Sequence, residues 1–239
     1  MRHLGITAND QNRNVGCRSA ELETSSLWQF LNGDGLDCMR RVGVYGGAFN
    51  PIHCGHRDVV KQAISVLDRI IIIPSAHHPF AKELLPFHHR VNMAKLSVAE
   101  FLADINVDVS EIEQTFETTK PVYTFDLLTA LERDQALSPT NAQLSFIIGP
   151  DNVKQWQKFY RANEIERRWS VLAVDERKPI RATAIRQQLG EYWRLQQRRN
   201  EGNNLALIKA LRQALAQNLG ERVLQYILDH QLLRPPRLA

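Results

Sequence analysis

The stretch VGVYGGAFNPIHCGH, Val42 to His56, decides the fold. Its start is apolar and predicts a short buried strand, and Gly46 and Gly47 mark a turn directly after it. The spacing of apolar residues from Gly55 to Leu67 then predicts a helix. A strand that leads through a glycine-rich loop into a helix is the first part of a unit that places the next strand parallel to the first.

The same alternation continues toward the C-terminus. Further strands are predicted at 69–73, 105–109, 144–148 and 170–174, with helices at 86–102 and 124–136. These strands are continuous apolar runs, which is typical of strands buried on both faces. The predicted fold class is therefore α/β, a Rossmann-like parallel sheet with helices on both faces. Apolar residues spaced by three or four over 205–219, and a short helix around 223–227, add a helical C-terminal tail.

Three segments are expected along the chain. Residues 1–38 are rich in Asn, Ser, Gly and Asp and form an N-terminal extension, partly disordered, to which no chemistry is assigned. Residues 39–189 form the Rossmann-like domain, and residues 190–239 form a helical segment packed on the same domain. Met39 stands directly before the first predicted strand, so whether translation also starts there is left open.

Composition excludes several classes. A chain of 239 residues with 44% hydrophobic residues can bury a core, so disorder of the whole chain is excluded. The longest apolar run, at 70–73, is far shorter than the roughly 18 residues of a membrane span, and the first residues lack an apolar signal core. We therefore expect a cytoplasmic protein without a membrane partner. Cys17, Cys38 and Cys54 show no CxxC spacing, which favours reduced thiols.

The charge is uneven. From Arg161 onward the chain holds fifteen Lys and Arg against eight Asp and Glu, whereas the whole chain carries a net charge of only +4. This basic half suggests an anionic partner. A phosphorylated small molecule and a nucleic acid both fit that charge.

The loop after the first strand has the features of a phosphate site. Ligands of open parallel sheets bind at the carboxyl ends of the strands, where this loop lies. Gly46 and Gly47 let backbone amides approach a ligand, and the helix N-terminus near Gly55 offers unpaired N–H groups. His53 and His56 are three residues apart, so both imidazoles can face one polyphosphate.

A second anchor is IRATAIR, residues 180–186. Thr183 and Arg186 lie three apart at the start of a predicted helix, so a hydroxyl, the helix amides and a guanidinium can converge on an anion.

Both anchors resemble the signatures of the nucleotidyltransferases that carry an HxGH motif and an ISxTxxR motif. The resemblance implies a Rossmann-like fold and transfer of a nucleoside monophosphate from a triphosphate to an acceptor phosphate. This chain departs from the second motif, because Arg181 stands where the family usually has Ser.

Four further segments are similar to the nicotinate/nicotinamide mononucleotide adenylyltransferases, which join ATP and a pyridine mononucleotide. These segments are residues 74–96, PVYTFDLL at 121–128, IIGPDNV at 147–153 and VLQYILDHQLL at 223–233. The resemblance implies that His53, His56 and Arg186 are catalytic. It implies ATP binding by Gly46, Gly47, Ala48, Phe49, His53, His56, Gly149, Asp151, Thr183 and Arg186.

For the mononucleotide, the resemblance implies Lys82 and Arg90 near phosphates and Thr124 near the pyridine ring. Phe159 aligns with the Trp that stacks on this ring in the family, and Trp156 lies one turn earlier; either side chain could stack or belong to the core. Mg²⁺ is expected as a cofactor, bound mainly through the ATP phosphates. No metal site of the protein itself is expected, and His77, His78, His88 and His89 are taken as loop or surface residues.

Several alternatives remain open. The acceptor could be phosphopantetheine or a phosphorylated sugar or alcohol. A second class is a non-catalytic nucleotide-binding regulator whose basic half contacts nucleic acid, which the intact motifs argue against. The choice between nicotinate and nicotinamide, and the formation of a homo-oligomer, are also open.

Overall fold

A computed structural model describes residues 2–4, 40–76, 84–116, 121–134 and 142–235. The strands are β1 (Arg2–Leu4), β2 (Arg40–Gly47), β3 (Arg69–Pro74), β4 (Val107–Val109), β5 (Ala142–Ile148) and β6 (Ser170–Val174). The helices are α2 (Cys54–Ala63), α3 (Phe87–Phe101), α4 (Thr124–Arg133), α5 (Pro150–Val153), α6 (Ala162–Arg168), α7 (Ala182–Gln197), α8 (Asn204–Leu219) and α9 (Glu221–Asp229). Short 3₁₀ helices span Ile112–Thr115 and Trp156–Lys158.

The described strands form one parallel sheet in the order β1-β6-β5-β2-β3-β4. Val44 in β2 pairs with Ile71 of β3 on one side and with Phe146 of β5 on the other. From β2 the chain adds β3 and β4 outward in one direction and then returns to place β5 on the opposite side. The strand order therefore reverses between β2 and β5, which is where such sheets bind ligands. The predicted α/β parallel fold is confirmed.

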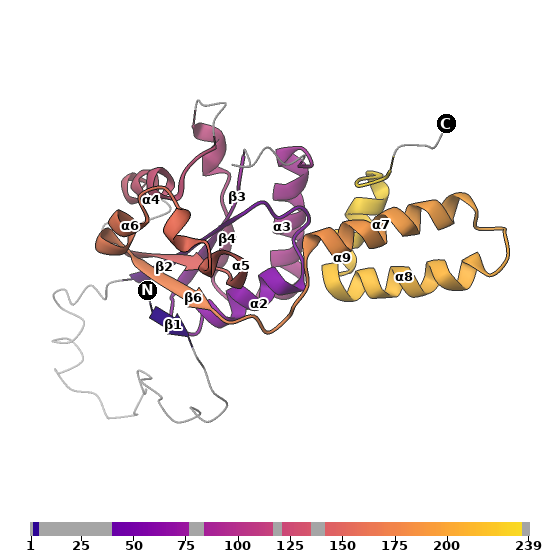
Figure 1. Cartoon of the computed structure of the whole chain (residues 1–239), viewed down its shortest axis with the longest axis horizontal. Coiled ribbons are helices and arrows are strands. Elements are labelled where there is room, and N and C mark those ends of the chain that lie inside the picture. Colours follow the sequence, from indigo (N-terminus) through magenta and orange to yellow (C-terminus); the bar gives the residue numbers. More distant parts are fainter. Residues whose placement is uncertain (1, 5–39, 77–83, 117–120, 135–141, 236–239) are drawn as a thin grey trace, which may run out of the picture.

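Successive side chains of the strands point alternately into two apolar layers, one on each face of the sheet. Ile70 and Ile72 of β3 enter the layer beneath α2, α3 and the C-terminal helices, whereas Ile71 and Ile73 enter the layer with α4 and α6. All four side chains are fully buried. Helices therefore cover both faces of the sheet, as the continuous apolar strands predict (Figure 1).

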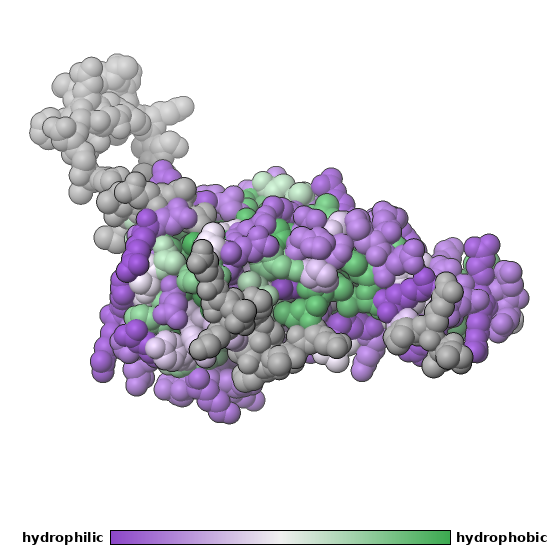
Figure 2. All heavy atoms as spheres, turned by 90° about the horizontal axis from the view of Figure 1, so that it is seen from above, coloured by the Kyte–Doolittle hydropathy of each residue, from purple (hydrophilic) through white to green (hydrophobic). Residues whose placement is uncertain are grey.

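The C-terminal helices share the first of these layers. Helix α7 runs through residue 189, where a boundary is expected from the sequence, and forms with α8 a hairpin that projects from the sheet (Figure 1). Arg57 of α2 fastens the hairpin, because its guanidinium donates to the carbonyls of Leu219 and Asn218 at 2.8 and 3.1 Å and lies 4.0 Å from the centre of the Phe101 ring. Seen from above, apolar residues show between the α/β unit and the hairpin, and the outer end of the hairpin is mostly hydrophilic (Figure 2).

One strand is not anticipated by the sequence. Residues 1–38 are expected to form a partly disordered extension, and no strand is predicted there, yet Arg2–Leu4 pairs with β6 as the outermost strand. A three-residue strand is too short to show periodicity, and it forms because β6 otherwise presents an unpaired edge. Residues 5–39 lie outside the described part of the chain. Within that part, no helix is long and apolar enough to cross a membrane.

Candidate functional site

A cavity of about 570 Å³ opens at the carboxyl ends of β2, β5 and β6. Every residue predicted from the sequence to bind ATP lines it: Gly46, Gly47, Ala48, Phe49, His53, His56, Gly149, Asp151, Thr183 and Arg186. These residues come from three separate stretches of sequence. The sheet brings them together because β2 and β5 are neighbours at the point where the strand order reverses.

The two histidines are held in one tautomer by backbone amides. The Gly55 N–H donates to His53 Nδ1 at 3.2 Å, and the His53 N–H donates to His56 Nδ1 at 3.1 Å. In a neutral imidazole whose Nδ1 accepts, the proton resides on Nε2. Each ring thus has an Nε2–H donor to offer, and the ring centres are 3.8 Å apart. The sequence predicts unpaired N–H groups near Gly55. For Gly55 itself this prediction is wrong, because its N–H is capped by the His53 side chain.

Burial keeps these histidines neutral. The pKa of His53, which is only 5% exposed, is lowered to about 4, first by loss of solvent and then by the positive charges of Arg57 and Arg181. The pKa of His56 is lowered well below its usual value by burial, by His53 and by Arg57. At neutral pH the pair therefore carries no positive charge and can offer hydrogen bonds to a negatively charged group.

Arg186 joins the two sequence anchors. Its guanidinium donates to the Asn50 carbonyl of the glycine-rich loop at 2.9 Å and to Thr183 Oγ1 at 3.1 Å. Because α7 begins at Ala182, Thr183 and Arg186 lie one turn apart on the same side of the helix. The hydroxyl and the guanidinium lie together as the sequence predicts, and their convergence on an anion stays a prediction.

The shape of the glycine-rich loop depends on a strained aromatic residue. Phe49 has a φ of 45°, a region that costs a side-chain-bearing residue about 1–3 kcal/mol, and it is held there by burial of its ring. A Cβ on Gly47 would lie 3.1 Å from that ring, whereas a Cβ on Gly46 would meet nothing within 4 Å. Gly46 therefore leaves room on the cavity side, and Gly47 makes room for Phe49.

Arg90 shapes the loop rather than facing a phosphate, which corrects its predicted placement. It is 1% exposed, and its guanidinium donates to the carbonyls of Leu85 and Ala48 at 2.9 Å each and of Ala76 at 3.5 Å. Buried Glu113 accepts from the Ala76 N–H at 2.7 Å, and loss of solvent raises the pKa of this carboxyl to about 7. Arg90 thus supports Ala48 from beneath the cavity.

Among the described residues, the others predicted for the mononucleotide do not line the cavity. Trp156 is 2% exposed, packs against Phe146 and donates from Nε1 to Glu166 at 2.6 Å, so a stacking role for Trp156 is wrong and its ring belongs to the core. Phe159 is half-buried against the same cluster. Thr124 begins α4 away from the cavity lining. Lys82 lies outside the described residues.

The cavity also contains several charged residues that belong to none of the sequence motifs. Asp175, Glu176, Arg177 and Lys178 follow β6, and Asp58 extends from α2. The signal that could have found the first four is their position directly after a predicted strand. Within the described ranges, no group of three or more His, Cys, Asp or Glu side chains is arranged to hold a metal ion.

A parallel sheet that gathers two imidazole donors, a guanidinium and glycine amides at its switch point has the architecture of a nucleotidyltransferase. More specifically, the chain belongs to the cytidylyltransferase-like family, which matches residues 44–188.

Two curated relatives show a more specific resemblance. A probable nicotinate-nucleotide adenylyltransferase from Desulfotalea psychrophila is 34% identical over 51% of this chain and 58% of its own length. One from Albidiferax ferrireducens is 37% identical over 53% of this chain and 61% of its own length. The matched part of the chain thus spans about three fifths of these curated relatives. The resemblance to nicotinate-nucleotide adenylyltransferases stated from the motifs is confirmed.

Solved structures agree on the fold. A putative nicotinate-nucleotide adenylyltransferase from Vibrio parahaemolyticus is 25% identical, with a TM-score of 0.61 over 83% of this chain and 98% of that one. A nicotinic acid mononucleotide adenylyltransferase from Plasmodium falciparum, complexed with NaAD, is 16% identical, with a TM-score of 0.58 over 81% of this chain and 97% of that one. The second likeness concerns the fold alone.

Proposed function

We propose that this chain transfers the adenylyl group of ATP to the phosphate of a pyridine mononucleotide, with nicotinate mononucleotide as the preferred acceptor. The observation that carries the proposal is the convergence of His53, His56, Thr183 and Arg186 on one cavity at the switch point. The choice of nicotinate is supported by the names of the curated relatives. The product would be the dinucleotide, together with pyrophosphate.

In the proposed reaction, an oxygen of the acceptor phosphate attacks the α-phosphorus of ATP. A new P–O bond forms as the bond from the α-phosphorus to the bridging oxygen of pyrophosphate breaks. The Nε2–H groups of His53 and His56 stabilise the charge that develops on the phosphates. Arg186 and Thr183 hold the leaving pyrophosphate. No side chain acts as a nucleophile, so positioning and charge neutralisation supply the rate.

We also propose that Mg²⁺ enters with ATP. Carboxylates are suitable ligands for this ion, and Asp58 and Asp175 line the cavity. The metal would neutralise phosphate charge, held mainly by the nucleotide and water. The carboxylates would orient its water ligands.

The test is pyrophosphate release by the full chain with ATP and Mg²⁺, comparing nicotinate mononucleotide, nicotinamide mononucleotide and 4′-phosphopantetheine. We expect release with nicotinate mononucleotide that is lost in His53→Ala. Leu207→Ala serves as the control, because this side chain is 52% exposed on α8 and does not line the cavity. Release with phosphopantetheine alone, or with none of the three acceptors, would overturn the proposal.

A further inference from the structure

Arg181 pairs with two carboxylates that line the cavity, one in helix α5 and one in its own loop between β6 and α7. Its Nη2 lies 2.8 Å from Asp151 Oδ1, and its Nη1 lies 2.5 Å from Glu176 Oε1. Asp151 follows β5 and Glu176 follows β6, while Arg181 itself is the residue from which α7 departs. One guanidinium therefore joins helix α5 to the loop between β6 and α7, and both border the cavity.

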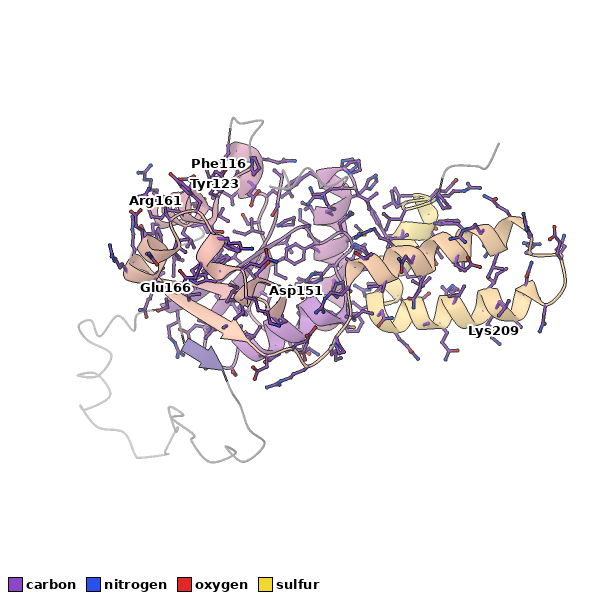
Figure 3. The ribbon with its side chains drawn as sticks, in the orientation of Figure 1. Phe116, Tyr123, Asp151, Arg161, Glu166 and Lys209 are labelled. Atoms are coloured by element: carbon purple, nitrogen blue, oxygen red, sulfur yellow. The ribbon has the colours of Figure 1, made fainter. Side chains whose placement is uncertain are left out.

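The ion pair with Arg181 favours one direction of the Asp151 carboxylate. This side chain is 60% exposed, and Arg181 is its one ion-pair partner among the described residues. An exposed carboxylate without such a partner samples several rotamers, and ordering it on binding costs free energy. Figure 3 places Asp151 between the sheet and the start of the helical hairpin.

Charge determines which part of a nucleotide can face this group. Arg181, Asp151 and Glu176 together carry a net charge of −1, so as a unit they do not attract a polyphosphate. The hydroxyls of a ribose are donors, and a carboxylate accepts from them, as acidic residues do at the switch points of other dinucleotide-binding sheets. His53, His56 and Arg186 already provide the phosphate-binding donors.

We propose that Arg181 is a positioning residue that holds Asp151 to accept from the ribose hydroxyls, and that it thereby sets the preference of the site for ribonucleotides. The inference rests on the proposed function in one respect, the assignment of the cavity to ATP. It concerns a position where the chain departs from the motif of its family, since Ser at 181 could not reach both carboxylates.

Calorimetric binding of ATP and of 2′,3′-dideoxy-ATP to the full chain tests the proposal. In Arg181→Ser, ATP affinity should fall about 10-fold or more, because hydrogen bonds to an ordered charged group are lost. The affinity for the dideoxy analogue, which lacks both hydroxyls, should change less than about 3-fold. Arg181→Lys, which keeps a cation near Asp151, should recover part of the ATP affinity. In turnover, the KM for ATP should rise while kcat changes little.

The control is Arg177→Ser, which removes the same charge from the same loop and also lines the cavity. It should weaken both nucleotides by a similar factor. Equal losses for ATP and the dideoxy analogue in Arg181→Ser would overturn the inference, because they would mean that Arg181 acts on the phosphates. A wild-type protein that binds both nucleotides equally would overturn it too. A failure of acceptor turnover with intact discrimination would refute only the proposed function.

Discussion

The two sides of strand β5 are built in different ways. Toward β2, the cavity is lined by polar groups such as His53 and Arg186, and hydrogen bonds to backbone atoms hold these side chains in place. On the face with α4 and α6, aromatic rings such as Trp156 and Trp169 pack into a core, and their N–H groups reach glutamates. A polar side chain fixed by the backbone still offers its outer atoms to a ligand, whereas a ring buried on both faces offers none.

On the side with α4 and α6, the exposed aromatic residues are tyrosines and not the buried tryptophans. Tyr123 and Tyr160 are 45% and 49% exposed, and their ring centres are 4.8 Å apart. Figure 3 shows Tyr123 near Phe116 and Arg161, on the side of the molecule away from the helical hairpin. The comparison therefore predicts that changes on the cavity side affect turnover, and that changes to the buried rings affect stability.

The largest expected effect is on stability. Trp156→Ala should lower the free energy of unfolding by about 3–5 kcal/mol, because it leaves a cavity in the core and removes the partner of Glu166. Urea unfolding followed by circular dichroism measures this. Tyr160→Ala is the exposed control and should cost no more than about 0.5 kcal/mol. The comparison breaks if Trp156→Ala keeps its stability and instead raises the KM for the acceptor.

The next effect is on turnover. His56→Ala should lower kcat by about 10²–10³, or about 2.7–4 kcal/mol in the transition state, because it removes a donor aimed at developing charge. Steady-state pyrophosphate release measures it. His89→Ala is the matched control, since His89 bonds the Tyr226 hydroxyl at 2.9 Å and does not line the cavity. Unchanged kcat in His56→Ala would refute the assignment.

The polar side should also make stability depend on pH. His53 has a folded-state pKa of about 4 against 6.5 in the unfolded chain, so between these values the unfolded state binds more protons. The neutral imidazole contributes fully above pH 6.5, and about 3 kcal/mol is lost as the pH falls toward 4. Urea midpoints between pH 4 and 7 measure this loss.

His53→Asn is the control for this pH dependence. Asn is a good N-cap without a titrating ring, so this variant should lose less stability over the same pH range. Parallel pH curves for the two proteins would show that His53 does not titrate as a buried group. The lowered pKa of His56 acts in the same direction, so some pH dependence remains in the variant.

What the sequence could predict follows the same division. The glycine-rich loop and its histidines lie within eleven residues directly after a strand, so local spacing suffices to place them at the end of the sheet. Whether the Trp156 ring belongs to the core depends on Phe146 and Glu166. These residues contact it only because β5 and α6 pack beside it. The Asp151 partner of Arg181 likewise comes from helix α5, on the other side of β6 in the sequence. Such tertiary contacts leave no pattern in a single sequence.

The smallest expected effect separates two adjacent glycines. Gly47→Ala should cost about 1–3 kcal/mol in stability, because its Cβ would lie 3.1 Å from the Phe49 ring that holds the strained loop. Gly46→Ala should stay within about 0.5 kcal/mol, since its Cβ meets no protein atom, yet it should weaken ATP binding because the methyl group enters the cavity. Thermal unfolding and calorimetry distinguish these outcomes. Equal destabilisation by both substitutions would mean that Phe49 does not set the shape of the loop, and unchanged ATP affinity in Gly46→Ala would mean that the nucleotide does not approach this part of the backbone.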